Sequence, residues 1–419
     1  MESTVKTVAV IGCGARGCGT YARIMKGSFS DRFRVVALCD VKPELLERYG
    51  EIHEVPEADR FTDETVFFEK KRADLLLVCT QDADHTRMII KGLSLGYDIL
   101  AEKPLTSSRK DCRALLAAQK KYGGKVLVCH VLRYAPAFRK VAELLDAGEI
   151  GKLAAIEATE QVWYPHQAHS FVRGNWRNSK ETSPMIIAKC CHDLDLLQYY
   201  AGSRCRSISS VGDLSWFKPE NAPAGAADRC TECPHIDTCP YSAKRIYIDR
   251  WKNYPDSWFS YIIAFERPLT EEALEKAIQD GPYGRCVYHC DNDVVDHQMT
   301  TMTFENGVKA TLTMTAFTAN GGRIMSFYGS LGEIVLNEDE NTVKLMKFGE
   351  EPQVWKISEL VTSGSGHGGG DYGLVAELAD MVDGKAPART SLAASIESHL
   401  MAICAEESRL AGGKLKKVH

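Results

Sequence analysis

Short apolar runs alternate with amphipathic stretches through the first part of the chain. The apolar runs have the length of strands, and apolar residues at helical spacing fill the intervals between them. The runs cover residues 8–11, 34–39, 74–79, 97–101 and 125–129. Apolar strands separated by helices are typical of a parallel sheet that is covered on both faces. We therefore predict an α/β domain with a doubly wound parallel sheet over residues 1–133.

The pattern changes after this point. Helix-type patterns over 136–147 and 184–200 flank a strand over 153–163, and strands with alternating polar and apolar residues follow, over 301–304, 308–315, 323–328, 333–336 and 343–348. Such alternation indicates antiparallel strands with one buried face. Two helical patterns, 371–382 and 391–410, come last. We predict an α+β domain over residues 134–419 with an open, largely antiparallel sheet, and a homodimer or homotetramer formed through the uncovered face of that sheet.

A glycine-rich turn joins the first apolar run to the next helix pattern. Its spacing, with Gly17 as the third glycine, permits a tight turn and close approach of a pyrophosphate, as in a Rossmann domain. Asp40 ends the next strand and can accept hydrogen bonds from the ribose of NAD, whereas it would repel the 2′-phosphate of NADP. The alternative is that Asp40 only caps the helix from Pro43. Besides Asp40, the residues expected to contact NAD here are Gly12, Cys13, Gly14, Ala15 and Arg16.

Polar residues also follow the later strands of the predicted parallel sheet. Ligands of such sheets bind outside the carboxyl ends of the strands, so residues at these ends should converge on one site. The polar residues that lie at or just beyond these ends are Thr80, Asp82, His85, Glu102, Lys103 and His130. We expect the first five of them to contact the cofactor.

The order of these motifs resembles that of the Gfo/Idh/MocA family of NAD(P)-dependent oxidoreductases. The resemblance rests on the glycine turn, Asp40, residues 101–105, Arg133-Tyr134 and residues 192–197, and it spans nearly the whole chain. It implies an NAD-dependent enzyme that moves a hydride between nicotinamide and a hydroxyl carbon of a sugar, cyclitol or sugar derivative. The alternatives are an NAD-dependent redox glycoside hydrolase and a non-catalytic NAD-binding sensor.

The resemblance also implies roles for single side chains. Lys103 would lie beside the substrate hydroxyl and the nicotinamide ribose, and Glu102 would hold the ribose. His192 would be the general acid or base, with a pKa near the working pH. A cation near the reacting oxygen favours an alkoxide-like transition state. The alternatives are a solvated turn lysine at Lys103 and a hydrogen-bonded core histidine at His192.

The segment before His192 departs from the family pattern. The family's dehydrogenases commonly carry an aspartate four residues before this histidine, where this chain has Ala188. The departure keeps the redox glycosidase open as an alternative. A helix over 185–200 would place Lys189, His192 and Asp193 on one side, which makes Lys189 a further catalytic candidate.

Other residues are candidates through the resemblance or their setting. Trp176 and Arg177 resemble a family segment near the nicotinamide, with ordinary loop packing as the alternative. His367 lies in a glycine-rich stretch, 364–370, that could place it over a substrate or serve only as a linker. We expect the substrate to contact Lys103, Arg133, His192, Asp193 and His367.

Three of the fifteen cysteines have the spacing of metal ligands. Cys230, Cys233 and Cys239 could form a structural zinc clip, with His235 between them, but a tetrahedral site needs a fourth ligand that the sequence does not assign. The alternative is that these cysteines are reduced or locally paired. Several other cysteines end apolar runs, where a free thiol acts as a small hydrophobe, so we expect few or no disulfides.

Charge and hydropathy restrict the partners. Lysine and arginine number 51 against 56 acidic residues, the net charge is −5, and no dense basic stripe occurs. This argues against nucleic acid or anionic membranes as partners. No run approaches membrane-spanning length and the first residues have no apolar signal segment, so we expect a cytoplasmic protein. The family resemblance implies a small sugar or glycoside as its substrate.

Overall fold

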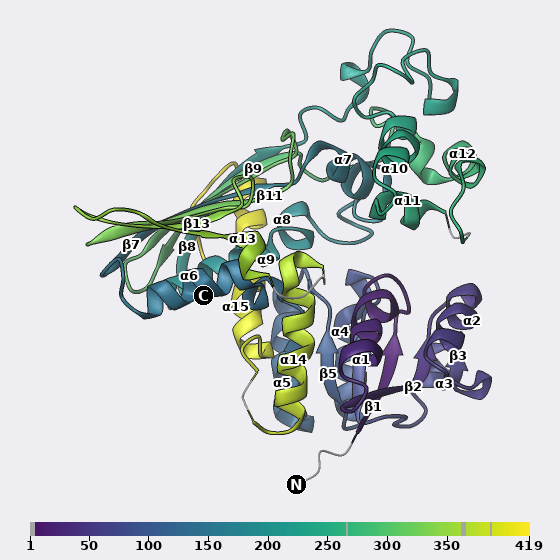
Figure 1. Ribbon diagram of the computed structural model, residues 1–419, viewed down its shortest axis with the longest axis horizontal. Helices are drawn as coiled ribbons and strands as arrows, with labels where there is room; N and C mark the ends of the chain where they lie inside the picture. Colours follow the sequence, from purple (N-terminus) through teal and green to yellow (C-terminus); the bar gives the residue numbers. More distant parts are fainter. Residues whose placement is uncertain (1–4, 265–266, 362–365, 386–387) are drawn as a thin grey trace.

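The computed structural model describes residues 5–264, 267–361, 366–385 and 388–419 and contains two separate sheets (Figure 1). The first has six strands in the order β3-β2-β1-β4-β5-β6, and every pairing is parallel. The chain moves outward from β1 in one direction and then from β4 in the other, which confirms the doubly wound topology. The strands are β1 (Lys6–Ile11), β2 (Phe33–Cys39), β3 (Arg60–Phe61), β4 (Leu75–Val78), β5 (Asp98–Ala101) and β6 (Val126–Val128).

Helices cover both faces of this sheet, as the apolar strands require. Val8, Leu76 and Leu100 are completely buried, because the strands have no face exposed to water. The helical segments between the strands are η1 (Gly17–Ala22), α1 (Arg23–Ser28), α2 (Pro43–Ile52), η2 (Glu57–Asp59), α3 (Glu64–Phe67), α4 (Asp82–Ser94) and α5 (Arg109–Tyr122).

The second sheet has nine strands in the order β14-β13-β12-β11-β7-β10-β9-β8-β15. Among the described strands, β7 and β10 form the one parallel pair, so the sheet is mixed and largely antiparallel, as predicted. The strands are β7 (Leu153–Gln161), β8 (Cys205–Asp213), β9 (His297–Phe304), β10 (Lys309–Thr315), β11 (Gly322–Gly329), β12 (Gly332–Asn337), β13 (Thr342–Lys347), β14 (Gln353–Lys356) and β15 (Lys416–Lys417).

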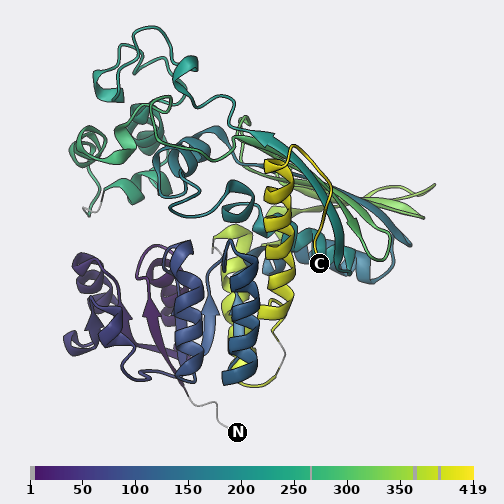
Figure 2. The same cartoon turned by 180° about the vertical axis from the view of Figure 1, so that it is seen from behind.

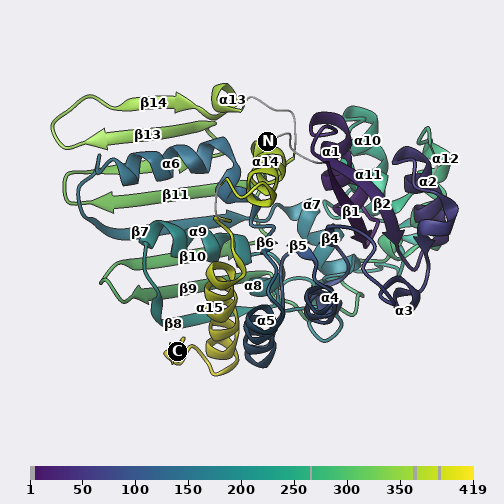
Figure 3. The same ribbon diagram turned by 90° about the horizontal axis from the view of Figure 1, so that it is seen from below.

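One face of the second sheet is covered by helices (Figure 3). On the other face, Val211 and Met299 are opposite each other on β8 and β9 and are 52% and 54% exposed. Assembly through this uncovered face stays a prediction. The covering helices are α6 (Pro136–Asp146), α9 (Cys191–Ala201) and α15 (Leu392–Leu410), and the short helices nearby are η3 (Val131–Tyr134), α8 (Met185–Ala188) and α13 (Ile357–Leu360).

The last helices return to the first sheet. α15 lies beside α5, and α14 (Gly370–Val382), which follows η9 (His367–Gly369), contributes Leu374 and Leu378 to the core beneath β1 (Figure 2). The Val128 amide donates to the Thr390 carbonyl at 2.9 Å, which ties the edge of the first sheet to the chain before α15. The N-terminal sheet is therefore completed by residues from the far end of the sequence.

The described residues of 214–296, here called the cap segment, lie beyond the carboxyl ends of the parallel strands (Figure 1). They form a small core of their own with α7 and η4, in which Phe217, Tyr247 and Leu274 are buried. The helical pieces are α7 (Tyr164–His166), η4 (Gln167–Arg173), η5 (Pro219–Asn221), η6 (Cys230–Glu232), η7 (Lys244–Asp249), α10 (Arg250–Asn253), α11 (Trp258–Ile263), α12 (Glu271–Asp280) and η8 (Pro282–Gly284). None of the described helices is long and apolar enough to cross a membrane.

The predicted helix over 185–200 is wrong in one respect. The structure has two helices, α8 and α9, with a break at Lys189 and Cys190. At the break the Ala188 carbonyl accepts a hydrogen bond from Lys103 Nζ, and Lys189 turns to Glu160. These long-range contacts stabilise the break, although the apolar pattern continues through it.

Candidate functional site

The glycine turn fits a pyrophosphate. Gly12 has φ +88°, and a Cβ on it would lie 2.3 Å from the carbonyl oxygen of Cys79 at the end of β4. A Cβ on Gly17 would lie 2.2 Å from the Gly12 carbonyl oxygen, whereas a Cβ on Gly14 would meet no atom within 4 Å. The first and third glycines are thus required by packing, and the second leaves open space beside the turn. A dinucleotide backbone approaches such a turn at this position.

Asp40 and Thr80 lie at the neighbouring strand ends. Asp40 accepts hydrogen bonds from the backbone N–H groups of Cys13, at 2.7 Å, and Lys42, at 3.0 Å. The first bond fixes the carboxylate against the glycine turn, and each carboxylate oxygen can still accept a further bond from a ribose hydroxyl. Thr80 Oγ1 is buried without a hydrogen-bond partner among the described residues. An unpaired buried hydroxyl beside the turn is consistent with a cofactor site.

Arg16 links the glycine turn to two carboxylates. It donates to Glu102 at 2.8 Å and to Asp371 at 2.8 Å, and Tyr21 also donates to Glu102, at 2.6 Å. Burial raises the pKa of the Glu102 carboxyl, but the charges of Arg16 and Lys103 outweigh burial and hold it below its ordinary value. Glu102 is therefore an ionised anchor for Arg16, and its expected contact with the ribose stays a prediction.

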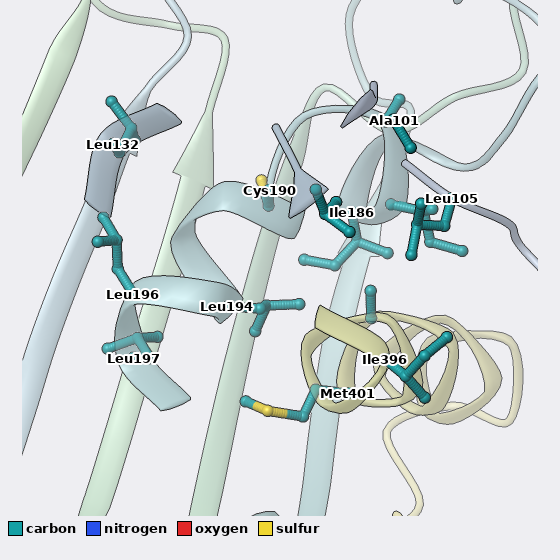
Figure 4. Packing of buried hydrophobic residues seen from close by; sticks show 14 of the residues in the cluster. Ala101, Leu105, Leu132, Ile186, Cys190, Leu194, Leu196, Leu197, Ile396 and Met401 are labelled. Atoms are coloured by element: carbon teal, nitrogen blue, oxygen red, sulfur yellow. The ribbon is translucent and has the colours of Figure 1, made fainter. Parts of the chain in front are cut away.

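Lys103 and His192 come together through packing of α8 across the end of β5. Ile186 of α8 lies near Ala101 and Leu105, which flank Lys103 in the sequence (Figure 4). Lys103 Nζ donates to the Ala188 carbonyl at 3.0 Å, and α9 begins three residues later. The charge of Lys103 is near enough to His192 to lower the pKa of its imidazole.

The expected pKa of His192 is wrong for this structure. Burial, and then the positive charge of Lys103, lower the pKa of the imidazole well below its ordinary value. The ring is neutral at neutral pH and can accept a proton, and its Nδ1 is buried without a partner among the described residues. The ring centroids of His130 and His367 lie 5.9 Å and 6.1 Å from that of His192.

His367 approaches the site from the C-terminal part of the chain. Its Nδ1 lies 3.1 Å from Asp371, the carboxylate that also accepts from Arg16. This connects His367 to the glycine turn through Asp371. Residues 364 and 365 of its glycine-rich stretch lie outside the described residues.

A buried charged cluster lies at the break between α8 and α9. Glu160 is 3.1 Å from Lys189 and 2.7 Å from Arg323, and Arg323 donates to Asp193 at 2.7 Å. Lys189 and Asp193 therefore share this cluster through Glu160 and Arg323. Burial raises the pKa of the Asp193 carboxyl to about 7 and outweighs the opposing charge of Arg323.

Sequence reasoning missed Glu160, Arg323 and an aromatic wall. Glu160 and Arg323 are opposite each other on β7 and β11, and a signal was available, since both are charged residues at positions that alternation assigns to the covered face. The ring centroid of His166 lies 5.3 Å from that of Trp258 of the cap segment and 5.7 Å from that of Phe171. Burial, and then the positive charge of Lys189, lower the pKa of the His166 imidazole well below its ordinary value. No motif indicated these rings.

The structure corrects the expected role of Arg133. Its guanidinium donates to both oxygens of Asp195, at 2.6 Å and 2.7 Å, and the two side chains are 6% and 1% exposed. Arg133 holds η3 to α9 and has no exposed face for a substrate.

Arg177 and its neighbours form contacts between loops, and their expected roles near the cofactor stay predictions. Arg177 donates to Asp291 at 2.8 Å and pairs with Glu181 at the surface, and Trp176 donates to Asp82 at 3.2 Å. Asp82 accepts a second hydrogen bond from Ser183, at 2.6 Å. These contacts join loops to one another.

His85 likewise joins two loops. Its ring nitrogens lie 2.7 Å from the Pro104 carbonyl oxygen and 3.0 Å from that of Thr80. A neutral imidazole has one N–H and can donate to only one of these carbonyls. The ring bridges the loops after β4 and β5, and the predicted contact of His85 with the cofactor stays a prediction.

All fifteen cysteines are unpaired in the structure. In the part of the chain that the structure describes, no three histidine, cysteine, aspartate or glutamate side chains are arranged as ligands of a metal ion. Cys230, Cys233 and Cys239 nevertheless line one cavity, which is considered below.

Comparison with known proteins identifies the class. Residues 6–130 match the model of an oxidoreductase family with an NAD-binding Rossmann fold, and residues 138–231 match the GFO/IDH/MocA C-terminal domain. The chain belongs to the Gfo/Idh/MocA oxidoreductase family, as the resemblance of its motifs predicted.

Two curated oxidoreductases are similar to this chain in sequence. The chain is 24% identical over 414 residues to putative oxidoreductase YteT of Bacillus subtilis, covering 92% of this chain and 90% of the relative. It is 25% identical over 197 residues to an inositol 2-dehydrogenase of Burkholderia multivorans, covering 46% of this chain and 54% of the relative.

Two solved structures share the fold. A levoglucosan dehydrogenase in complex with NADH and levoglucosan has a TM-score of 0.71 at 17% identity, covering 99% of this chain and 100% of that one. The WlbA dehydrogenase of Bordetella pertussis in complex with NADH and UDP-GlcNAcA has a TM-score of 0.71 at 14% identity, covering 100% and 98%. Both similarities concern the fold.

Proposed function

We propose that the protein is an NAD-dependent oxidoreductase that transfers a hydride between nicotinamide and a hydroxyl-bearing carbon of a sugar, cyclitol or sugar derivative. The observation that carries the proposal is the bond from Lys103, just after β5 and two strands from the glycine turn, to the Ala188 carbonyl ahead of α9. The charge of Lys103 is near enough to His192 to lower the pKa of the imidazole. The relatives described as acting on inositol and levoglucosan support a polyhydroxylated substrate.

Each side chain of the site would have a separate role in such a reaction. Bound NAD would supply the hydride acceptor. Lys103 would hold the substrate hydroxyl and stabilise negative charge that develops on its oxygen. His192, neutral because of burial and the charge of Lys103, would accept the hydroxyl proton. The rings of His166 and Trp258 would pack against an apolar face of the sugar.

Asp40 supports NAD rather than NADP as the cofactor. Its carboxylate is held against the glycine turn by the Cys13 amide. In this position it can accept from ribose hydroxyls, and it would repel a phosphate on the ribose.

A redox glycosidase is the second candidate. Ala188 replaces an aspartate common among the dehydrogenases that the chain resembles, and Asp193, with its pKa raised to about 7 by burial, could protonate a leaving group. In that case the hydride would be returned to the substrate after elimination, and no NADH would accumulate.

A substrate screen with two variants tests the proposal. Sugars and aryl glycosides are incubated with NAD, and NADH and released phenol are recorded. Lys103→Met and His192→Asn should each lower turnover by about 10²–10⁴-fold while NAD still stabilises the protein. Lys110→Met, an exposed lysine on α5, is the matched control and should keep normal turnover.

The outcomes separate the candidates. Steady NADH formation supports the dehydrogenase, and phenol release without net NADH supports the glycosidase instead. NAD binding with neither product across the screen would favour the sensor and overturn the proposal. Near-normal turnover in either variant would remove that residue from the catalytic roles.

A further inference from the structure

Four cysteines line one small cavity in the cap segment. Cys230, Cys233 and Cys239 come from the loop around η6, and Cys286 comes from the chain after η8. The cavity has about 20 Å³ of room for a water-sized group, enough for one small occupant. Cys286 supplies the fourth thiol that the spacing of the other three lacks.

Backbone contacts fix Cys286 beside this loop. The Cys286 amide donates to the Asp228 carbonyl at 2.8 Å, and Arg229 and Arg285 form an antiparallel bridge. These bonds join two segments that lie far apart in the sequence. The four thiols therefore meet through the fold and not through local sequence alone.

Arg173 provides an independent observation. It is 1% exposed and lines the same cavity, and no described carboxylate forms an ion pair with it. Its Nη2 lies 3.5 Å from Cys230 Sγ, and the guanidinium also donates to the carbonyls of Arg285 and Tyr241. Its Nη1 has no partner among the described residues. A buried cation needs an anion nearby. When all the thiols are protonated, the cavity provides no negative charge to offset the Arg173 guanidinium.

Two hydrogen-bond donors face the Cys230 sulfur. Its sulfur accepts from the Arg173 guanidinium and from the Ala243 amide, at 3.4 Å for the latter. Donors that point at one sulfur stabilise negative charge on it.

We propose that Cys230, Cys233, Cys239 and Cys286 bind one zinc ion as four thiolates. Each thiol releases its proton on binding, and the resulting anionic centre offsets the charge of Arg173. Four sulfur ligands favour a tetrahedral ion such as zinc. The sulfurs line the cavity without being in ligating positions, and a cysteine side chain has a single torsion that can turn its sulfur inward.

The ion would stabilise a segment with little regular structure. Between β8 and η7 the described chain contains only two short helical turns, η5 and η6. Small regions of this kind gain stability from a metal or a disulfide, and no disulfide is present in this chain. η7 packs against α11, where Ser260 donates to the Tyr247 carbonyl at 2.7 Å. The zinc would thus help to hold α11 and its Trp258 beside the candidate site.

Metal analysis of the full-length protein tests the proposal. Protein purified from zinc-supplemented medium should contain about one zinc per chain by mass spectrometry, and Cys286→Ser should retain less than about a tenth of it. Cys290→Ser is the matched control, because Cys290 is on the same segment, donates to the Cys286 carbonyl at 3.2 Å, and lies outside the cavity lining. It should keep its zinc.

The wild-type protein supplies a test that does not depend on folding of a variant. After exchange of zinc for cobalt, thiolate-to-cobalt charge-transfer absorption should appear together with the ligand-field bands of a tetrahedral site. A thiol-modifying reagent should release the metal as the four cavity cysteines react.

Several results would overturn the proposal. These are wild-type protein without zinc, iron with acid-labile sulfide in its place, or a disulfide among the four cysteines. Loss of zinc in Cys290→Ser but not in Cys286→Ser would also overturn it. His235 lines the cavity too, with Nε2 held 2.8 Å from the Ala224 carbonyl, so loss in His235→Ala but not in Cys286→Ser would refute the ligand set.

Discussion

Replacing Arg133 by methionine distinguishes a structural role from a substrate-binding role. The guanidinium and the Asp195 carboxylate form two short hydrogen bonds, at 2.6 Å and 2.7 Å, and both side chains are almost fully buried. Methionine keeps much of the packing volume and removes the charge, which leaves Asp195 buried without its counter-ion. Removing one partner of a buried pair costs about 3–5 kcal/mol of stability.

This magnitude translates into a large thermal shift. At about 2–4 °C per kcal/mol for domains of this size, Arg133→Met should melt about 6–20 °C below the wild type in scanning calorimetry. A chain with two sheets can unfold in more than one step. The calorimetric transition that shifts in the variant should therefore be compared with the same transition of the wild type. The double variant Arg133→Met with Asp195→Leu is the control. It removes the uncompensated carboxylate and should recover much of the loss.

Kinetics provide the opposing test. At a temperature where Arg133→Met is folded, its KM for the substrate found in the screen should equal that of the wild type within about twofold, since no substrate group reaches the guanidinium. If Arg133→Met has the melting temperature of the wild type but a KM raised about tenfold or more, this reasoning is refuted. Arg133 would then bind substrate, as the family resemblance implied.

Two further predictions concern the cofactor side of the site. Asp40→Ala should weaken NAD binding and reduce discrimination against NADP in calorimetric titrations, and equal affinity of the wild type for both would count against the role of Asp40. Although burial raises the pKa of the Asp371 carboxyl, hydrogen bonds from His367 and Arg16 outweigh it and hold that pKa below the ordinary range. The contribution of the ionised Asp371 to the stability of the fold is therefore present at neutral pH and is lost as the pH falls below about 4. The gap in unfolding free energy between wild type and Asp371→Asn, measured by urea titration, should shrink between pH 7 and about pH 3, and a constant gap would contradict this.

The parallel sheet could be predicted because its signals are local. Apolar runs such as residues 8–11 and 97–101 have no polar face, and each ends at a glycine or a polar cluster. The same local logic identified the glycine turn and Lys103. The proximity of Lys103 to His192 was an expectation of the family resemblance, and the hydrogen bond from Lys103 to the Ala188 carbonyl, just before α9, explains it.

The remainder depends on contacts between distant residues. The helix break at Lys189 follows from its pairing with Glu160, and Arg133 is occupied because Asp195 faces it from α9. A sequence pattern shows the type of each residue but not which partner it will meet. For this reason Arg133 could be mistaken for a substrate ligand. Cys286 was missed for the same reason, since it lies far along the chain from Cys239.

The C-terminal part of the chain completes the site that the N-terminal sheet begins. His367 has φ 53°, a left-handed conformation that a residue other than glycine adopts at a cost. Its hydrogen bond to Asp371 helps to retain this conformation, and Asp371 in turn holds Arg16 in the glycine turn. Because the ring centroid of His367 lies 6.1 Å from that of His192, the same contacts that order the turn also place a second imidazole near the candidate base. Ordering of the turn around a dinucleotide and positioning of His367 should therefore be coupled through Arg16 and Asp371.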